Sequence, residues 1–124
     1  MIVSMGIDLT PHAEMATAVR DQGEAFVRVV LTEREAASLS KSRRRDAQLS
    51  AFFSIKEAAM KALGRGLLDG LWFTDVEVLE NPRRLEWRRA ALKRYRELGE
   101  PKVHVALGQD RSRSFAMVVL ERVA

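Results

Sequence analysis

The sequence predicts an α+β fold in which helices pack on a small antiparallel sheet. Three observations indicate this class: strand-like apolar or alternating segments near both ends of the chain, helix signals through the first half, and turn residues between the elements. A chain of 124 residues suits one domain over residues 1–124. It is long enough to bury one core and short enough for oligomerisation to matter.

The chain is expected to begin with a strand and two helices. Ile2 to Ile7 is an apolar run typical of a short buried strand. Thr10-Pro11 has the pattern of an N-cap followed by proline at the first helical position, so a helix is expected to about Arg20 or beyond. The capping-box pattern Thr32-Glu33-Arg34-Glu35 then predicts the start of a second helix.

A third helix is predicted from about Leu49 to Leu63. It stops at Gly64-Arg65-Gly66, a typical C-terminal glycine signal. Four of its residues follow helical spacing and mark a core face, namely Phe52, Ile55, Ala59 and Ala62. The basic stretch Lys41 to Arg45 is assigned to the loop or helix end before it.

The second half is expected to contain three strands and one helix. Trp72 to Leu79 alternates, which predicts a half-buried strand with Asp75 and Glu77 on its polar side. After a turn at Asn81-Pro82, a fourth helix is predicted over about residues 85–98.

Two closing strands complete the predicted sheet. Lys102 to Leu107 alternates between apolar and polar residues. Phe115 to Leu120 is a continuous apolar run, which indicates a central strand. No internal repeat, linker or low-complexity segment interrupts the pattern.

Composition narrows the function classes. The chain has no cysteine, which excludes disulfides and thiolate chemistry, and no apolar run approaches the roughly 20 residues of a membrane span. We therefore expect a cytoplasmic protein without a membrane partner. The net charge is +4, and the basic residues concentrate in Lys41 to Arg45 and in Arg83 to Arg96. Such patches either attract anions or are solvated surface, and composition does not decide between them.

Two local patterns have the residues for phosphate and metal chemistry. Asp8 ends the first strand, and Glu57 and Lys61 lie four residues apart on one face of the third helix. Mg²⁺ takes one or two protein carboxylates and completes its shell with phosphate and water. Asp8 and Glu57 supply those carboxylates if the strand lies beside the helix, with Lys61 binding phosphate. Alternatively, Glu57 and Lys61 are a helix-stabilising pair and Asp8 caps the first helix.

Several motifs stand in order along nearly the whole chain. They are Gly6-Ile7-Asp8-Leu9, Val30-Leu31-Thr32-Glu33, Lys56-Glu57-Ala58, Lys61-Ala62-Leu63-Gly64, Asp75-Val76-Glu77-Val78, Val103-His104-Val105 and Ala116 to Glu121. Together they resemble the holo-acyl carrier protein synthase family of short-type 4′-phosphopantetheinyl transferases. The resemblance implies transfer of 4′-phosphopantetheine from coenzyme A to a serine of an apo acyl carrier protein, with release of 3′,5′-ADP.

The resemblance also assigns residues. It implies that Asp8 and Glu57 hold Mg²⁺ against the coenzyme A pyrophosphate and that Lys61 contacts the same phosphates. We expect Glu57 and Lys61 to be catalytic. Glu57, or a water that it orients, is the candidate general base because it is the only obvious carboxylate on that helix face; a metal-bound water is the alternative. It implies a homotrimer with its active sites at subunit interfaces. The residues expected to bind coenzyme A are Lys56, Lys61, Gly64, Arg44 and Arg45.

The sequence departs from the family pattern at Glu14, Phe52 and Gln109, where many members have Arg, Arg and His. We therefore expect Arg44 and Arg45, with their neighbour Arg43, to approach the 3′-phosphate of coenzyme A. The first-helix region is net negative, so docking of an acidic carrier is assigned to Arg20, Arg28, Arg88 and Arg89. A second class of function is also consistent with the sequence, namely a catalytically silent module that binds carrier protein or nucleic acid. No nucleic-acid partner is expected under the enzyme hypothesis.

Overall fold

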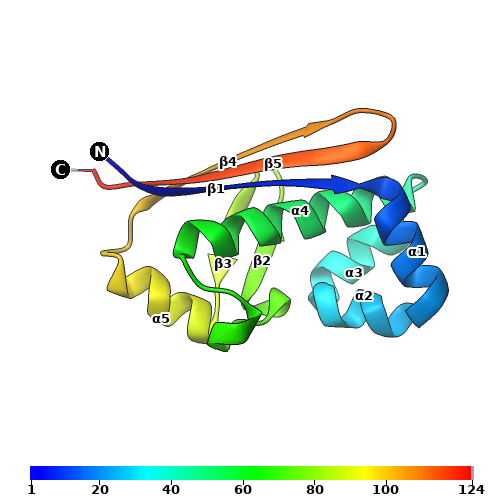
Figure 1. Cartoon of the computed structure of the whole chain (residues 1–124), viewed down its shortest axis with the longest axis horizontal. Helices are drawn as coiled ribbons and strands as arrows, with labels where there is room; N and C mark the ends of the chain where they lie inside the picture. The colour runs from blue at the N-terminus through cyan, green and yellow to red at the C-terminus, as the bar shows by residue number, and fades with distance from the viewer. Residues whose placement is uncertain (124) are drawn as a thin grey trace.

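The computed structural model describes residues 1–123, with helix α4 (Arg45–Leu63) lying along one face of a three-stranded antiparallel sheet (Figure 1). The strand order is β1 (Ile2–Pro11), β5 (Arg113–Glu121) and β4 (Lys102–Gln109). The predicted α+β class is confirmed, and the run expected to be a central strand is the middle strand of this sheet.

The remaining elements cover the side of α4 that faces away from the sheet (Figure 1). At one end lie α1 (His12–Gln22), α2 (Glu24–Val30) and α3 (Glu33–Ser40). Toward the other end lie the 3₁₀ turns Leu67–Asp69 and Phe73–Asp75, the hairpin β2 (Val76–Leu79) and β3 (Arg84–Trp87), and α5 (Arg89–Glu97). Because α4 is covered on both sides, it is buried over most of its length.

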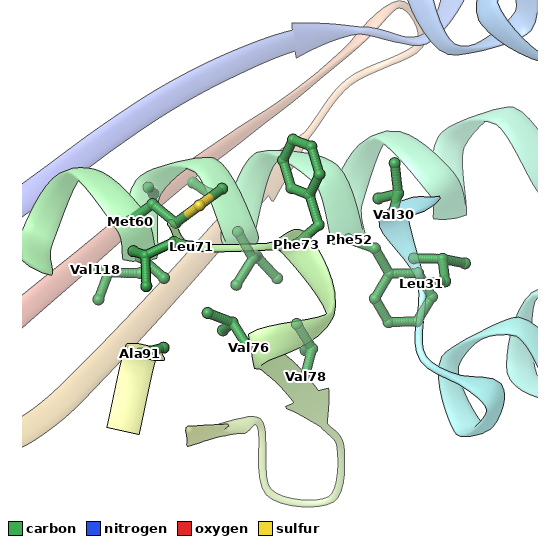
Figure 2. Close-up of a cluster of buried hydrophobic side chains, with 14 of the residues drawn as sticks. Val30, Leu31, Phe52, Met60, Leu71, Phe73, Val76, Val78, Ala91 and Val118 are labelled. Atoms are coloured by element: carbon green, nitrogen blue, oxygen red, sulfur yellow. The ribbon is translucent and has the colours of Figure 1, made fainter. Parts of the chain in front are cut away.

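The hydrophobic core therefore forms on both faces of α4 (Figure 2). The predicted core face of this helix is confirmed, since its residues are 2% exposed or less: Phe52, Ile55, Ala59 and Ala62. Phe52 lies near Val30 and Leu31, whereas Met60 lies near Leu71 (Figure 2). Both contacts lie on the side of α4 that faces away from the sheet. On the sheet side, α4 contacts β5, whose buried Val118 belongs to the same core cluster. Helix α4 thus joins the sheet to the elements that cover its other face.

Several predicted boundaries were wrong. Helix α4 begins at Arg45, four residues earlier than expected, so the basic stretch enters its first turn. Strand β1 extends to Pro11, which is the N-cap of α1 rather than its first helical residue. An additional helix, α2, follows the positive-φ residue Gly23. The capping box of α3 is confirmed: Thr32 and Glu35 bond each other's backbone N–H groups.

The predicted fourth helix over residues 85–98 was also wrong at its start. Residues Arg84–Trp87 pair antiparallel with β2, with Val76 opposite Trp87 and Val78 opposite Leu85. The pairing buries Trp87 against the core, and helix α5 starts only at Arg89. The single predicted sheet is thus a three-stranded sheet plus a separate hairpin. Asp75 and Glu77, expected on a polar face, are both buried.

The sheet face opposite α4 is apolar and open. Strand β1 was predicted to be buried, yet Met5, Ile7 and Leu9 are 45–50% exposed, and Phe115 of β5 is 41% exposed. Pairing with β5 places Met5 beside Val119, Ile7 beside Met117 and Leu9 beside Phe115. No described segment of this chain covers these rows (Figure 1).

Candidate active site

The site depends on an unusually close approach of β1 to α4. A Cβ on Gly6 would lie 1.9 Å from the backbone oxygen of Ala58, so only glycine permits this contact. The Ser4 hydroxyl donates to the carbonyl of Ala62 on the same helix. The condition set by the sequence is therefore met: the strand that carries Asp8 lies directly beside the helix that carries Glu57 and Lys61.

Asp8 forms the centre of a polar cluster. Lys61 Nζ lies 3.2 Å from Asp8 Oδ1 and 3.0 Å from the carbonyl oxygen of Ile7. Asp8 Oδ2 accepts hydrogen bonds from Thr10 Oγ1 at 2.7 Å and from Ser54 Oγ at 2.9 Å. The ammonium group of Lys61 thus lies on the exposed side of Asp8, where Asp8 Oδ1 and the Ile7 carbonyl oxygen both favour a positive charge.

Glu57 lies on the face of α4 that also carries Lys61, but its negative charge has fewer bonded partners than that of Asp8. Its side chain is half-buried, and among residues 1–123 no donor forms a hydrogen bond or ion pair with its carboxylate. Burial raises the pKa of Glu57, and the negative charge of Asp8 raises it further, while Lys61 partly opposes both effects. The negative charge of Glu14, on α1, adds a smaller upward contribution.

A groove of about 310 Å³ opens beside these residues. One wall is the α4 face that carries Glu57, Met60 and Lys61, and the other is the loop Arg65–Asp69. The loop turns away from α4 at Gly64, whose φ of +69° suits glycine. Leu67 and Leu68 are exposed on the groove's outer wall. The groove therefore combines two carboxylates (Glu57 and Asp69), two cations (Lys61 and Arg65) and apolar surface, a composition that can accept a phosphorylated ligand with an apolar chain.

The donor set suits a hard divalent cation. Within the described residues no cluster of three or more His, Cys, Asp or Glu could hold a metal, so a cation here would have at most two such side chains as ligands, and Asp8 and Glu57 are the candidates. Mg²⁺ accepts such a partial set when phosphate oxygens and water complete its shell. A cation between the two carboxylates would also relieve the charge repulsion that raises the pKa of Glu57. The residues present therefore fit Mg²⁺ bound together with a phosphate.

This chain is similar in sequence and in fold to known proteins. Residues 4–117 match the model of the 4′-phosphopantetheinyl transferase superfamily. The chain belongs to this family of transferases. It is 31% identical to the holo-[acyl-carrier-protein] synthase of Maridesulfovibrio salexigens, over 98% of this chain and all of the relative. It is 35% identical to the synthase of Desulfovibrio desulfuricans, over 98% of each chain.

A solved structure supports the same assignment. The crystal structure of a holo-(acyl-carrier-protein) synthase from Bacillus anthracis in complex with CoA (3′,5′-ADP) superposes with a TM-score of 0.79 at 26% identity, covering 99% of both chains. None of the helices in the described part of this transferase has the length and apolar character needed to cross a lipid bilayer.

Two residues expected to bind coenzyme A do not face the groove of this transferase. Lys56 is fully buried, pairs with Glu35 at 2.6 Å and donates to the Phe73 carbonyl at 3.1 Å. Burial lowers the pKa of Lys56 and the carboxylate of Glu35 opposes that effect. This corrects the expectation for Lys56, because its ammonium points into the protein. Gly64 shapes the loop through its backbone and does not itself line the groove.

The arginines assigned to the 3′-phosphate lie far from the cluster in the same chain. Arg44 is the N-cap of α4 and Arg45 its first residue. A rise of about 1.5 Å per residue puts Arg44 roughly 20 Å from Glu57 along the helix axis. Only a ribose separates the 3′-phosphate of coenzyme A from its pyrophosphate, so one chain cannot hold both groups with these residues. Arg45 also pairs with Glu24.

The four arginines assigned to carrier docking fall into two pairs. Arg88 binds the buried Glu77 at 2.7 Å, and Arg89 binds the buried Asp75 at 2.6 Å. Both guanidinium groups thus neutralise buried acids, although the Arg89 side chain stays 63% exposed. Arg20 and Arg28 are exposed on α1 and α2, and Arg20 lies 3.8 Å from Asp21. The docking role of these four arginines stays a prediction.

Sequence reasoning missed the hydroxyls that bind Asp8 and the loop that completes the groove. Ser54 lies three residues before Glu57, so helical spacing alone places it on the same face. That signal was present in the sequence. The sequence gave no such signal for the Arg65–Asp69 loop, because its path is set by backbone hydrogen bonds formed after α4 ends.

Proposed function

We propose that this transferase moves 4′-phosphopantetheine from coenzyme A to a serine of an apo acyl carrier protein, releasing 3′,5′-ADP in a reaction that depends on Mg²⁺. The observation that carries the proposal is the cluster of Asp8, Glu57 and Lys61 at the edge of a groove sized for a phosphorylated ligand. The names of the relatives and the ligand in the Bacillus anthracis structure support the same reaction.

The residues have separate roles in phosphoryl transfer, a reaction that depends on positioning and charge neutralisation more than on covalent catalysis. Asp8 and Glu57 would hold Mg²⁺, which neutralises charge on the pyrophosphate when bound. Lys61 moves from Asp8 toward the phosphates and binds them as a point charge. The loop Arg65–Asp69 forms the second wall and limits the access of water.

The chemical step is attack of the carrier serine oxygen on the β-phosphorus of coenzyme A. The new P–O bond forms as the bond between that phosphorus and the bridging oxygen breaks, and the bridging oxygen leaves with 3′,5′-ADP. Glu57 accepts the serine proton, directly or through a water that it orients.

We further propose that the enzyme is a homotrimer whose sites lie between subunits. The open apolar rows of β1 and β5 would be buried by neighbouring copies, since a patch of this kind is costly to leave in water. A neighbouring chain would also let Arg43, Arg44 and Arg45 reach the 3′-phosphate, which is too far within one chain. Light scattering should give a trimer, and Ile7→Lys should dissociate it with loss of activity. A stable, active monomer would contradict this assembly.

The carrier partner is proposed to be acidic and to dock beside the groove. Of the four arginines assigned to docking, Arg20 and Arg28 form no ion pair with a buried acid, so they are the first candidates for steering. Exposed charges of this kind act mainly on the association rate, and added salt screens them. Neutralising both arginines should raise KM for the carrier a few-fold at low salt and less at high salt.

Mass spectrometry of candidate apo carriers incubated with the protein, coenzyme A and Mg²⁺ tests the proposed function. A mass gain of one phosphopantetheine on the carrier serine, abolished by EDTA, is the expected result. Binding of the carrier without any mass gain would instead favour the catalytically silent module.

A further inference from the structure

The two oxygens of the Asp8 carboxylate have different surroundings. Oδ2 accepts two hydrogen bonds, from Thr10 Oγ1 at 2.7 Å and from Ser54 Oγ at 2.9 Å. Oδ1 is contacted by Lys61 Nζ at 3.2 Å, and the Lys61 side chain is 52% exposed. Oδ2 is therefore saturated by the protein, whereas Oδ1 is the oxygen left for a mobile cation.

Both hydroxyls are held on regular elements. Ser54 is fully buried in α4, and its Oγ lies 3.2 Å from the Asp8 carbonyl oxygen as well. Thr10 is 2% exposed and follows Asp8 by two residues, on the same face of β1. Neither hydroxyl can follow Asp8 if its carboxylate rotates. The pair therefore fixes which oxygen of Asp8 faces Lys61, a residue that lines the groove.

We propose that Ser54, assisted by Thr10, is a positioning residue that presents Asp8 Oδ1 alone to a divalent cation. Groups that hydrogen-bond a metal-binding carboxylate fix its orientation, and their loss typically lowers metal affinity by about 10- to 100-fold. The role of this cation in catalysis rests on the proposed function, whereas its binding does not.

Ser50 provides a matched control on the same helix. It lies one turn before Ser54 and is equally buried. Its Oγ pairs with Ser114 Oγ at 2.6 Å and donates to the Ala47 carbonyl at 3.0 Å, without contacting Asp8. Ser50→Ala therefore removes a buried hydroxyl of the same kind while leaving the Asp8 carboxylate untouched.

Metal binding is measured first, without turnover. The full-length protein with coenzyme A, and no carrier, is titrated with Mn²⁺ while electron paramagnetic resonance follows the free ion; coenzyme A alone gives the background. Ser54→Ala and Thr10→Val should each weaken Mn²⁺ binding by about 10-fold or more. Ser50→Ala should bind Mn²⁺ like the wild type. Ser54→Cys keeps a side chain of similar size with a weak hydrogen-bond donor, so its Mn²⁺ affinity should lie between those of Ser54→Ala and the wild type. It replaces Ser54→Ala in the experiment if that variant fails to fold.

Activity provides the second readout. In Ser54→Ala the Mg²⁺ concentration for half-maximal activity should rise by about 10-fold, and saturating Mg²⁺ should recover most of kcat. Wild-type Mn²⁺ affinity in both Ser54→Ala and Ser54→Cys would overturn the proposal. So would an equal loss in Ser50→Ala, which would mark a general packing defect. A wild type that binds Mn²⁺ but never transfers phosphopantetheine would overturn the proposed function and leave the positioning role standing.

Discussion

Lys56 and Glu57 are neighbours in the sequence but belong to two different charge clusters. Lys56 enters a closed network in the interior, where it pairs with Glu35 at 2.6 Å. Glu35 accepts from the Val78 backbone N–H at 2.6 Å, and Thr32 links this network to Glu77. Glu57 faces the opposite way, into an open cluster with Asp8 and Lys61 at the edge of a groove.

The difference lies in how completely each charge is compensated. Every buried acid of the closed network has a cationic or backbone partner, so the network is stable without a ligand. The open cluster leaves Glu57 without a partner, and its pKa is raised. An uncompensated carboxylate beside a groove indicates a ligand site. We therefore expect changes in the closed network to alter stability and changes in the open cluster to alter activity.

Removal of either carboxylate of the open cluster should have the largest effect. Asp8→Ala and Glu57→Gln are expected to lower the rate of phosphopantetheine transfer by about 1,000-fold or more, because both the metal ligands and the charge stabilisation are lost. Circular dichroism should show an intact fold. Glu97→Gln, an exposed change on α5, is the control. Near-normal turnover in either variant, or full activity in excess EDTA, would remove Asp8 and Glu57 from the metal site.

Breaking the closed network should instead destabilise the protein. Glu35→Ala leaves the Lys56 ammonium buried without its carboxylate, which typically costs about 3–5 kcal/mol of unfolding free energy. Urea denaturation measures this loss. Glu33→Ala, an exposed change in the same first turn of α3, should cost little. If Glu35→Ala were as stable as Glu33→Ala, the network would not be a structural element.

The sequence predicted the open cluster better than the closed one. Asp8, Glu57 and Lys61 were identifiable because helical spacing and strand position suffice to align them. The buried environment of Lys56 could not be identified from the sequence, because its partner Glu35 is 21 residues away. Asp75 and Glu77 were assigned to the polar face of a strand for the same reason. Tertiary packing decides which buried charges pair, and the periodicity of the sequence carries no information about that packing. The same limit explains the missed strand β3, whose residues have a helical pattern but pair with β2.

Lys61→Ala should have an intermediate effect. Loss of the ammonium removes a partner of the coenzyme A phosphates in a partly enclosed groove, so KM for coenzyme A should rise and the single-turnover rate fall, each by about 10- to 100-fold. Calorimetry with coenzyme A and single-turnover kinetics separate the two effects. Unchanged binding and unchanged rate would leave Lys61 as a surface residue that merely pairs with Asp8.

The Arg44 and Arg45 pair should have a smaller and more selective effect. Neutralising both should raise KM for coenzyme A several-fold, and should do so less for dephospho-coenzyme A, which lacks the 3′-phosphate. The trimer must stay intact in this variant, as light scattering can verify. Equal changes in KM for both coenzymes would disprove the 3′-phosphate role.

The pKa of Glu57 predicts a small effect on stability in the metal-free protein. Its folded-state pKa lies above the ordinary value of 4.5, so the stability given by the protonated form is present below pH 4.5 and is lost as pH rises through the folded pKa. In EDTA, Glu57→Gln should therefore melt higher than the wild type at pH 7. The difference should disappear at pH 4. A lower Tm for Glu57→Gln at pH 7 would mean that the charged carboxylate stabilises the fold.

We propose that the open cluster performs group transfer, whereas the closed network stabilises the fold. Mass spectrometry of one apo carrier after equal incubation with wild-type protein and with folded Glu57→Gln, in coenzyme A and Mg²⁺, separates these two roles. We expect complete phosphopantetheinylation of the carrier serine by the wild type and none by Glu57→Gln. Equal modification by the two proteins would contradict it.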